Sequence, residues 1–260
     1  MVPVFLSIAG SDCSAGAGLQ ADLKTGFALG CYPLTAVTCV VSEAPGTVEG
    51  IVPMAPDFVA GQVRLCLRSF PVAAVKAGML YSPQIAHAAM QALADFPGPL
   101  VVDPVMVATA GEPLVLQETI AAYGQAVFPR ATLLTPNLDE LQRLCGCAPL
   151  HTAGEMEAAA RQLCAQYGCA VLAKGGHMPG GTCTDILVQP GRPALSWSHP
   201  RTAGISTHGT GCTLSSAVTA HLALGHPLPR AVELSLAYVA GAIARSHRFP
   251  GTDALNHAKG

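Results

Sequence analysis

Residues 209–212 read Gly-Thr-Gly-Cys and stand where a glycine-rich turn meets a helical pattern. Gly209 and Gly211 allow several backbone N–H groups to point at one place, and the helix that follows adds the positive end of its dipole. This combination suits the binding of a phosphate group. The alternative is an ordinary helix start in which Thr210 is the N-cap and no ligand binds.

Cys212 places a thiol at that helix start. A thiol at a helix N-terminus has its pKa lowered from about 8.5 toward neutrality. A lowered pKa would make Cys212 a competent proton acceptor or nucleophile near pH 7. The alternative is a cysteine that is buried at the helix start only for packing.

Chemically distinctive residues also follow the expected strands, at the points where those strands end. In an open parallel sheet, ligands bind at the carboxyl ends of the strands. We therefore expect these side chains to line one cleft, although each alone would be ordinary loop composition. The residues are Asp12, Glu43, Met79, Asp103, Asn137 and Lys174.

The elements that position them are short apolar runs alternating with helical patterns. The expected strands are residues 4–8, 34–41, 72–76, 100–102, 132–134 and 170–173, and a hairpin is expected at 184–188 and 194–198. Helices are expected at 19–30, after Pro56, and at 83–94, 115–127, 138–145, 154–167, 211–224 and 230–247. The alternation predicts an α/β fold with a mostly parallel central sheet and helices on both faces. No linker or repeat is evident, so a single domain over residues 1–260 is expected.

The composition argues against several classes of protein. The 260 residues are 50% hydrophobic and 12% charged, with a net charge of −2, so neither a disordered chain nor a basic nucleic-acid-binding surface is expected. No apolar run approaches the roughly 20 residues of a membrane span, and the N-terminus lacks the positive region of a signal peptide. The ten cysteines include no Cys-x-x-Cys pair, which favours free thiols in a reducing cytoplasm.

Segments of the chain resemble the hydroxymethylpyrimidine and phosphomethylpyrimidine kinases of thiamine biosynthesis, members of the ribokinase-like superfamily. The segments occur in the same order: IAGSDCSAGAGLQADLKT, DPVMVATAGEPL, TPNLDE, LAKGGH and GTGCTLSSA. The resemblance implies a ribokinase-like fold, use of ATP and Mg²⁺, and a homodimer. It implies phosphoryl transfer to 4-amino-5-hydroxymethyl-2-methylpyrimidine and then to its monophosphate.

The resemblance also implies roles for the phosphate-side residues. Cys212 would take the proton of the substrate hydroxymethyl group, while the amides of the 209–212 turn stabilise the transferring phosphoryl group. Lys174 would bind the ATP phosphates, unless it is a solvated loop lysine. Asn137 and Glu140 match an Asn-x-x-Glu motif whose Glu helps to hold Mg²⁺, often through water, and Asp103 could contact Mg²⁺ or phosphate. The Asn137–Glu140 spacing is equally that of a helix capping box.

On the substrate side the resemblance points to Gly10, Asp12, Gly18, Glu43, Met79 and Val105. Asp12 would lie near the substrate hydroxyl, or else close a turn beside the neighbouring glycines. Met79 and Val105 would form apolar walls, with packing in the core as the default. His208 receives no role, because no partner for it is visible in the sequence.

The chain departs from the family pattern at Glu43, where a glutamine usually contacts the aminopyrimidine. Glutamine offers a donor and an acceptor, whereas a carboxylate only accepts. Glu43 could bind the amino group, pair with a protonated ring nitrogen, accept from the ring hydroxyl of pyridoxine, or lie in solvent. A pyridoxal or pyridoxine kinase is therefore the first rival function. A non-catalytic pyrimidine-sensing protein is the second, although the intact 209–212 turn and Lys174 argue against it.

Overall fold

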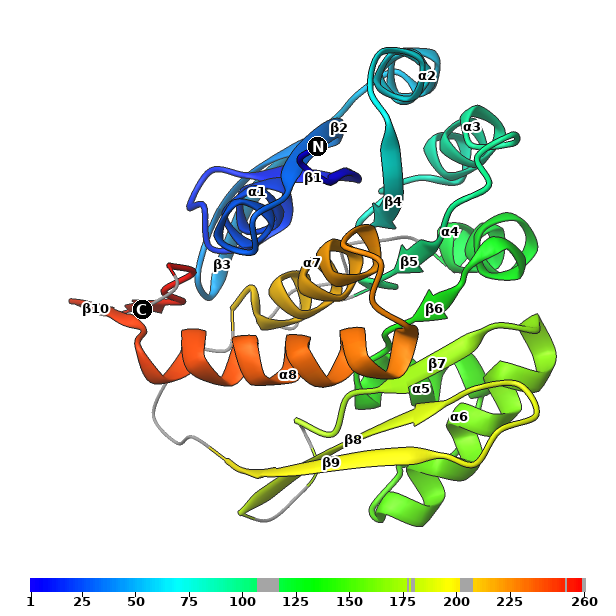
Figure 1. The fold of residues 1–260 in the computed structure, drawn as a ribbon, viewed down its shortest axis with the longest axis vertical. Helices are drawn as coiled ribbons and strands as arrows, with labels where there is room; N and C mark the ends of the chain where they lie inside the picture. The colour runs from blue at the N-terminus through cyan, green and yellow to red at the C-terminus, as the bar shows by residue number, and fades with distance from the viewer. Residues whose placement is uncertain (107–116, 177, 179–180, 202–207, 251, 259–260) are drawn as a thin grey trace.

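The computed structural model describes residues 1–106, 117–176, 178, 181–201, 208–250 and 252–258. Within them lies a nine-stranded sheet in the order β3-β2-β1-β4-β5-β6-β7-β8-β9. Its central strands β2, β1, β4, β5, β6 and β7 are parallel. β3 pairs antiparallel with β2 at one edge, and the β8–β9 hairpin is antiparallel at the other. The predicted α/β architecture is confirmed (Figure 1).

The strands agree closely with the apolar runs of the sequence. Their bounds are β1 (Val4–Asp12), β2 (Tyr32–Ala44), β3 (Thr47–Pro53), β4 (Val72–Ala77), β5 (Leu100–Val102), β6 (Leu133–Leu134), β7 (Ala170–Ala173), β8 (Thr182–Val188) and β9 (Leu195–Pro200). The expected hairpin is present as β8 and β9. The edge strand β3 was not expected from the sequence, because its residues are mostly exposed and Gly50 interrupts the apolar pattern.

Helices cover both faces of the sheet, as Figure 1 shows. One face carries α1 (Gly18–Ala28), α7 (Thr210–Ala223) and α8 (Leu228–Ala244). The other face carries α2 (Pro56–Ser69), α3 (Pro83–Ala92), α4 (Gln117–Ala122), α5 (Leu138–Cys145) and α6 (Ala153–Tyr167). A π-helical turn (Tyr123–Val127) and a 3₁₀ turn (Phe128–Arg130) follow α4. The start of the helix expected at 115–127 lies outside the described residues.

The parallel strands are apolar on both sides because both sides are covered. On β1, Leu6 and Ile8 belong to the core beneath α2, α3 and α6, whereas Phe5 packs with Ala217 of α7. Successive side chains of a strand point to opposite faces. By the same alternation, Ser7 of β1 and Lys76 of β4 point toward α1 and α7, where both are fully buried.

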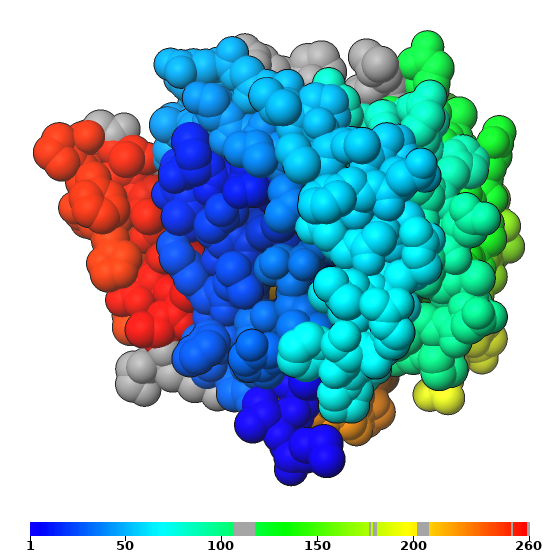
Figure 2. All heavy atoms as spheres, turned by 90° about the horizontal axis from the view of Figure 1, so that it is seen from above, coloured from blue at the N-terminus to red at the C-terminus, as the bar shows by residue number. Residues whose placement is uncertain are grey.

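The C-terminal segment folds back onto the helices of the first face. α8 ends at Ala244 rather than at 247, and the short strands β10 (His247–Phe249) and β11 (Thr252–Ala254) follow it. His257 then packs against α7 and α8, since its Nε2 lies 3.0 Å from Thr213 Oγ1 and its carbonyl accepts from Tyr238. Figure 2 shows this segment beside the N-terminal part of the chain.

No helix in the part of the chain that the structure describes is both long enough and apolar enough to cross a membrane.

Candidate functional site

The 209–212 turn forms the start of α7. Gly209 is the N-cap residue with φ of +79°, and the helix begins at Thr210, so the alternative in which Thr210 is the N-cap is wrong. A Cβ on Gly209 would lie 1.9 Å from the Gly16 carbonyl oxygen. Only glycine therefore fits here, on both conformational and steric grounds. The Thr210 hydroxyl is buried and has no hydrogen-bond partner among the described residues.

Gly209→Ala tests this tight packing, and Gly225→Ala, just after the other end of α7, is its matched control. Gly225 also has a positive φ (+86°), but nothing lies within 4 Å of the place where its Cβ would be. Gly225→Ala should cost only the left-handed conformation of one residue, about 1 kcal/mol, and leave ATP turnover unchanged. Gly209→Ala should lower the melting temperature further and abolish most ATP turnover, because the turn must move away from Gly16. Equal behaviour of the two variants would contradict this account.

Lys174 and Asp103 meet beside the turn. Lys174 Nζ lies 3.0 Å from Asp103 Oδ1, and the two side chains are 13% and 2% exposed. Thr135 and Ser215 also donate to Asp103. A Cβ on Gly211 would lie 3.3 Å from Lys174 Nζ. The ends of β5 and β7 are therefore joined to the start of α7, and Lys174 is not a solvated loop lysine.

Asn137 and Glu140 form the capping box of α5. The backbone amide of Asn137 donates to the Glu140 carboxylate at 2.8 Å, and the backbone amide of Glu140 donates to the Asn137 side-chain oxygen at 2.9 Å. Burial raises the pKa of Glu140 to about 7, an effect that Lys174 opposes and the charge of Asp103 increases. Two buried carboxylates near one lysine leave an excess of negative charge. A divalent cation with oxygen ligands would relieve that excess, so these residues fit Mg²⁺.

Cys212 lies on the first turn of α7, partly exposed as a residue. Burial of the thiol raises its pKa to about 11, while the Lys76 ammonium and the Gly18 amide act in the opposite direction. The predicted lowering of the Cys212 pKa is therefore wrong. The loss of hydration in the packed site outweighs the favourable position at a helix start, and the resting form near pH 7 is the neutral thiol.

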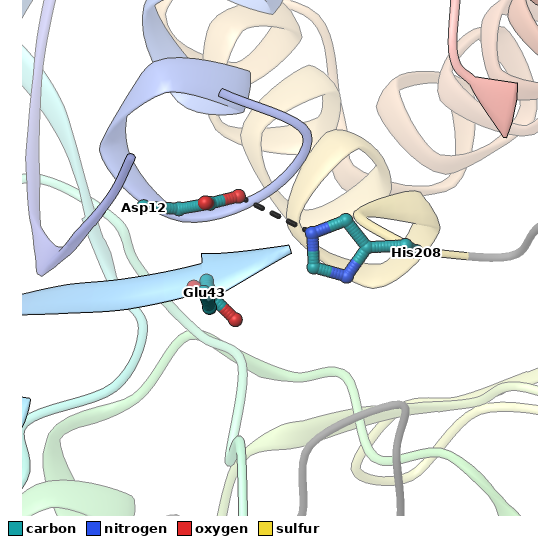
Figure 3. Close-up of side chains that lie close together, drawn as sticks. All are labelled: Asp12, Glu43 and His208. Atoms are coloured by element: carbon teal, nitrogen blue, oxygen red, sulfur yellow. Dashed lines mark hydrogen bonds and ion pairs between the residues drawn. The ribbon is translucent and has the colours of Figure 1, made fainter. Parts of the chain in front are cut away.

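Asp12, Glu43 and His208 form a second group (Figure 3). Their ligand atoms lie within 4.8 Å of one another, and His208 Nε2 is 3.2 Å from Asp12. Burial works against the charged Asp12 carboxylate. Hydrogen bonds from His208, Ala17 and Ser14 nevertheless lower its pKa to about 2. These hydrogen bonds hold the Asp12 carboxylate in place, at the position where the family resemblance predicts the organic substrate.

Glu43 is half-buried at the end of β2. Burial and the neighbouring Asp12 charge raise its pKa, and His208 opposes the shift. The alternative of a fully solvated loop glutamate is therefore wrong. The Asp12 side chain also accepts from the Ser14 amide at 2.7 Å, so it closes the turn that the sequence allowed as its alternative role.

The remaining predicted substrate residues lie around these two groups. Met79 packs in an apolar cluster with Cys39 and Met106, and Val105 lies at its margin. Gly18 has a φ of +54°, and a Cβ there would lie 2.5 Å from the Gly10 carbonyl oxygen. Gly18 is thus required for close approach of the two backbone segments, whereas a Cβ on Gly10 would lie 2.9 Å from both Cys39 Sγ and Met79 Cε. Any contact of either glycine with substrate stays a prediction.

The sequence profile of the family described as phosphomethylpyrimidine kinase matches residues 12–255. The chain belongs to this family. A hydroxymethylpyrimidine/phosphomethylpyrimidine kinase of Rhizobium meliloti is 38% identical over 249 residues, which are 96% of this chain and 93% of that protein. A putative hydroxymethylpyrimidine/phosphomethylpyrimidine kinase 2 of Schizosaccharomyces pombe is 40% identical over 276 residues, covering 98% of this chain. The chain spans about half the length of that relative and of other curated relatives that it matches.

The fold is shared with a solved vitamin kinase. A crystal structure of Bacillus subtilis pyridoxal kinase in complex with ADP is similar with a TM-score of 0.90 and 31% identity, covering 99% of this chain and 98% of that one. The family membership and this likeness together confirm the ribokinase-like fold that the sequence motifs implied.

Sequence reasoning missed three buried polar residues of this phosphomethylpyrimidine kinase family member. His208 received no role, yet it hydrogen-bonds to Asp12. Asp22 and Lys76 form a fully buried ion pair between α1 and β4. A signal was present, since Lys76 interrupts an apolar run that predicts a buried strand, and a buried lysine requires a carboxylate partner.

Proposed function

We propose that the chain is a kinase that transfers the γ-phosphoryl group of ATP to 4-amino-5-hydroxymethyl-2-methylpyrimidine, and then to its monophosphate, in thiamine biosynthesis. The observation that carries the proposal is the meeting of the 209–212 turn with Lys174 and Asp103 at one edge of the sheet. Backbone amides, a helix dipole and an ammonium ion converge where a transferring phosphoryl group needs them. The chain is also more similar to the two named pyrimidine kinases than to the pyridoxal kinase, at 38% and 40% against 31% identity.

The residues divide the reaction between them. The amides of Gly209, Thr210, Gly211 and Cys212 stabilise negative charge on the transferring group. Lys174 offsets the charge of the ATP phosphates. Cys212, in its thiolate form, accepts the proton of the substrate hydroxyl as the oxygen attacks phosphorus.

Asp103 and Glu140 would hold Mg²⁺, with water completing the coordination, while Asn137 caps the helix that positions Glu140. Mg²⁺ bound there would neutralise part of the negative charge on the ATP phosphates. The neighbouring Lys174 orients Asp103 through their ion pair, and the capping box fixes Glu140.

The substrate ring would lie between the Asp12–His208 pair and the apolar cluster of Met79, with Val105 at its margin. Asp12 stays ionised because several donors hold it. Glu43 then receives a hydrogen bond from the amino group or the protonated ring nitrogen of the pyrimidine.

A coupled assay of ADP release tests the proposal. Hydroxymethylpyrimidine, its monophosphate, pyridoxine and pyridoxal are compared as acceptors at equal concentrations. We expect the two pyrimidines to have the highest kcat/KM. Faster turnover of pyridoxal or pyridoxine would establish the rival kinase function, which the acceptor-only Glu43 and the likeness to a pyridoxal kinase support. Tight pyrimidine binding without ADP release would instead establish a sensing protein.

Glu43→Gln tests the proposed contact between Glu43 and the aminopyrimidine. In the wild type, KM for the aminopyrimidine should rise as pH falls through the raised Glu43 pKa, because the protonated acid loses the negative charge that strengthens its hydrogen bond with the amino group. The glutamine variant has no such titration, so its KM should be flat over the same range. Loss of the charge-assisted bond should raise its KM at neutral pH by about tenfold. A wild-type KM that does not change on acidification would contradict the contact.

Three further proposals rest on different grounds. We infer a homodimer from the family resemblance, a single kinase domain over residues 1–260 from the lack of a linker or repeat in the sequence, and a cytoplasmic location from the cysteine pattern. The ten free thiols of the structure are compatible with a reducing compartment.

A further inference from the structure

A second ion pair lies beneath the 209–212 turn. Lys76 Nζ of β4 is 2.5 Å from Asp22 Oδ1 of α1, and the two side chains are 1% and 0% exposed. Ser7 of β1 and Ser216 of α7 also donate to Asp22, each at 2.5 Å. Four elements therefore meet in one buried set of side chains, the Asp22 network, which consists of Ser7, Asp22, Lys76 and Ser216.

The network lies one layer below Cys212. Residues four apart on a helix share a face, one turn apart. Ser216 comes four residues after Cys212 on α7, and Asp22 comes four residues after Gly18 on α1. The Gly18 amide donates to the Cys212 sulfur, and Ser216 donates to Asp22. The contacts between α1 and α7 thus form two successive layers, with Cys212 in one and the ion pair in the next.

Lys76 reaches toward the same edge of the sheet. It is in register with Ser7 on the neighbouring strand β1. Its Nζ lies 3.6 Å from the position that a Cβ on Gly78 would take, and Gly78 follows the carboxyl end of β4. The ammonium is therefore near the level of the site, although its side chain is closed off from solvent.

Stability alone is a weak reason for such a pair. Removing two charges from water is costly, and apolar residues of similar volume often stabilise a fold as well or better. A buried lysine charge is explained more simply if it acts on a neighbour. Cys212 is the neighbour whose charge changes in the proposed reaction.

We propose that Lys76, held in place by Asp22, is a positioning residue that stabilises the Cys212 thiolate and so increases the fraction of enzyme ready to accept a proton. This inference rests on the role proposed above for Cys212. In that step the substrate oxygen forms a bond to the γ-phosphorus, and the bond from phosphorus to the ADP oxygen breaks with its electron pair. The hydroxyl proton passes to the Cys212 sulfur, which becomes a neutral thiol.

Four charged groups act on Cys212 from the elements packed around it. Lys76 favours the thiolate, whereas Asp22 and Asp103 oppose it. Lys174 also interacts with the sulfur. Each carboxylate is paired with one lysine. Removing the Lys76 charge should therefore disfavour the Cys212 thiolate, and removing the Asp22 charge should favour it.

The test measures the reactivity of Cys212 and needs no substrate. Trypsin cleavage after Arg201 and Arg230 releases residues 202–230, in which Cys212 is the only cysteine, so its alkylation by iodoacetamide can be followed by mass spectrometry. Below the thiol pKa the rate follows the thiolate fraction. We expect Lys76→Met to slow alkylation at pH 8 by about tenfold, and Asp22→Asn to accelerate it by about the same factor, equivalent to about one pKa unit each.

The alkylation rate should change in opposite directions in the two single variants if the effect is electrostatic. A structural effect would change the rate in the same direction in both, because both variants weaken the packing in the same way. Asp22→Asn/Lys76→Met carries neither charge and serves as the folding control, with an alkylation rate expected between those of the single variants. If Lys76→Met does not fold, the double variant must still react more slowly than Asp22→Asn. Unchanged rates, or changes of the same sign, would overturn the proposal.

Kinase turnover is measured separately with hydroxymethylpyrimidine and ATP. Lys76→Met should lower kcat on this alcohol while KM for ATP stays near its wild-type value. A wild type that does not phosphorylate any pyrimidine would refute the proposed function, whatever the alkylation rates are. Equal alkylation rates in an active kinase would refute only the role of Lys76.

Discussion

Cys212→Ala is expected to lower kcat on the hydroxymethylpyrimidine alcohol by about 10²- to 10⁴-fold, the usual contribution of a general base. KM for ATP should change little, because alanine keeps every backbone amide at the start of α7. Lys174 and Asp103 are also untouched by the substitution. The coupled assay of ADP release gives both constants from one titration with ATP.

The same variant should distinguish the two proposed phosphorylation steps. The monophosphate presents an oxygen that is already negative near pH 7, so its attack on ATP requires no base. Loss of Cys212 should therefore slow this second step by less than about tenfold, well below the contribution of a general base.

The raised thiol pKa of about 11 also predicts how turnover depends on pH. Between pH 7 and 9 the thiolate fraction rises about tenfold per pH unit, so turnover of the alcohol should rise with pH in the wild type and not in Cys212→Ala.

Cys147→Ala is the matched control for this experiment. Cys147 is an exposed thiol just after α5, and its Sγ lies 3.9 Å from the Gln142 carbonyl oxygen. Its removal should leave both steps at wild-type rates. Turnover of the alcohol by Cys212→Ala within tenfold of the wild type would contradict the role of Cys212 as the base.

The strand ends, and with them most of the site, could be predicted from the sequence. Parallel strands buried on both faces leave short apolar runs, and each run stops where the polar cleft begins. The runs 100–102 and 170–173 coincide with β5 and β7. Asp103 and Lys174 follow these strands directly, and the structure joins them in one ion pair.

Helix α1 shows why the rest could not be predicted. The helical spacing of Leu19, Leu23 and Phe27 predicts that these three side chains face the core. Leu19 is buried, yet Leu23 is 39% and Phe27 is 75% exposed. Asp22 and Thr25 are fully buried instead, because the face of α1 that meets α7 carries the Asp22 network. A hydrophobic pattern counts only apolar side chains, so it cannot reveal a buried ion pair.

The pKa of Cys212 depends on tertiary structure in the same way. A helix start lowers the pKa of a thiol wherever the sulfur remains hydrated. Here α1 and the lysine–carboxylate pairs surround the sulfur, and loss of hydration becomes the largest effect. The sequence identifies the residue and its place on α7, but only the packing determines the sign of the shift.

Lys174→Met is expected to reduce kcat/KM for ATP by at least about 10²-fold, the loss typical when one charge-stabilising donor is removed from a site. Methionine keeps much of the apolar stem but removes the positive charge beside the 209–212 turn. Asp103 would then face the phosphates without its counter-ion, so repulsion is added to the lost attraction. ATP turnover within tenfold of the wild type would contradict the contact between Lys174 and the nucleotide.

The folding cost of this change can be separated from the functional loss. Breaking a buried ion pair by removing one partner costs about 3–5 kcal/mol, because the remaining charge is left uncompensated. Asp103→Asn/Lys174→Met removes both charges and should recover most of the melting temperature, while ATP turnover stays low. If the double variant regained turnover together with stability, Lys174 would serve only to neutralise Asp103. Low turnover at restored stability instead means that lost folding stability does not explain the lost turnover, because the reaction needs the charged Asp103–Lys174 pair itself.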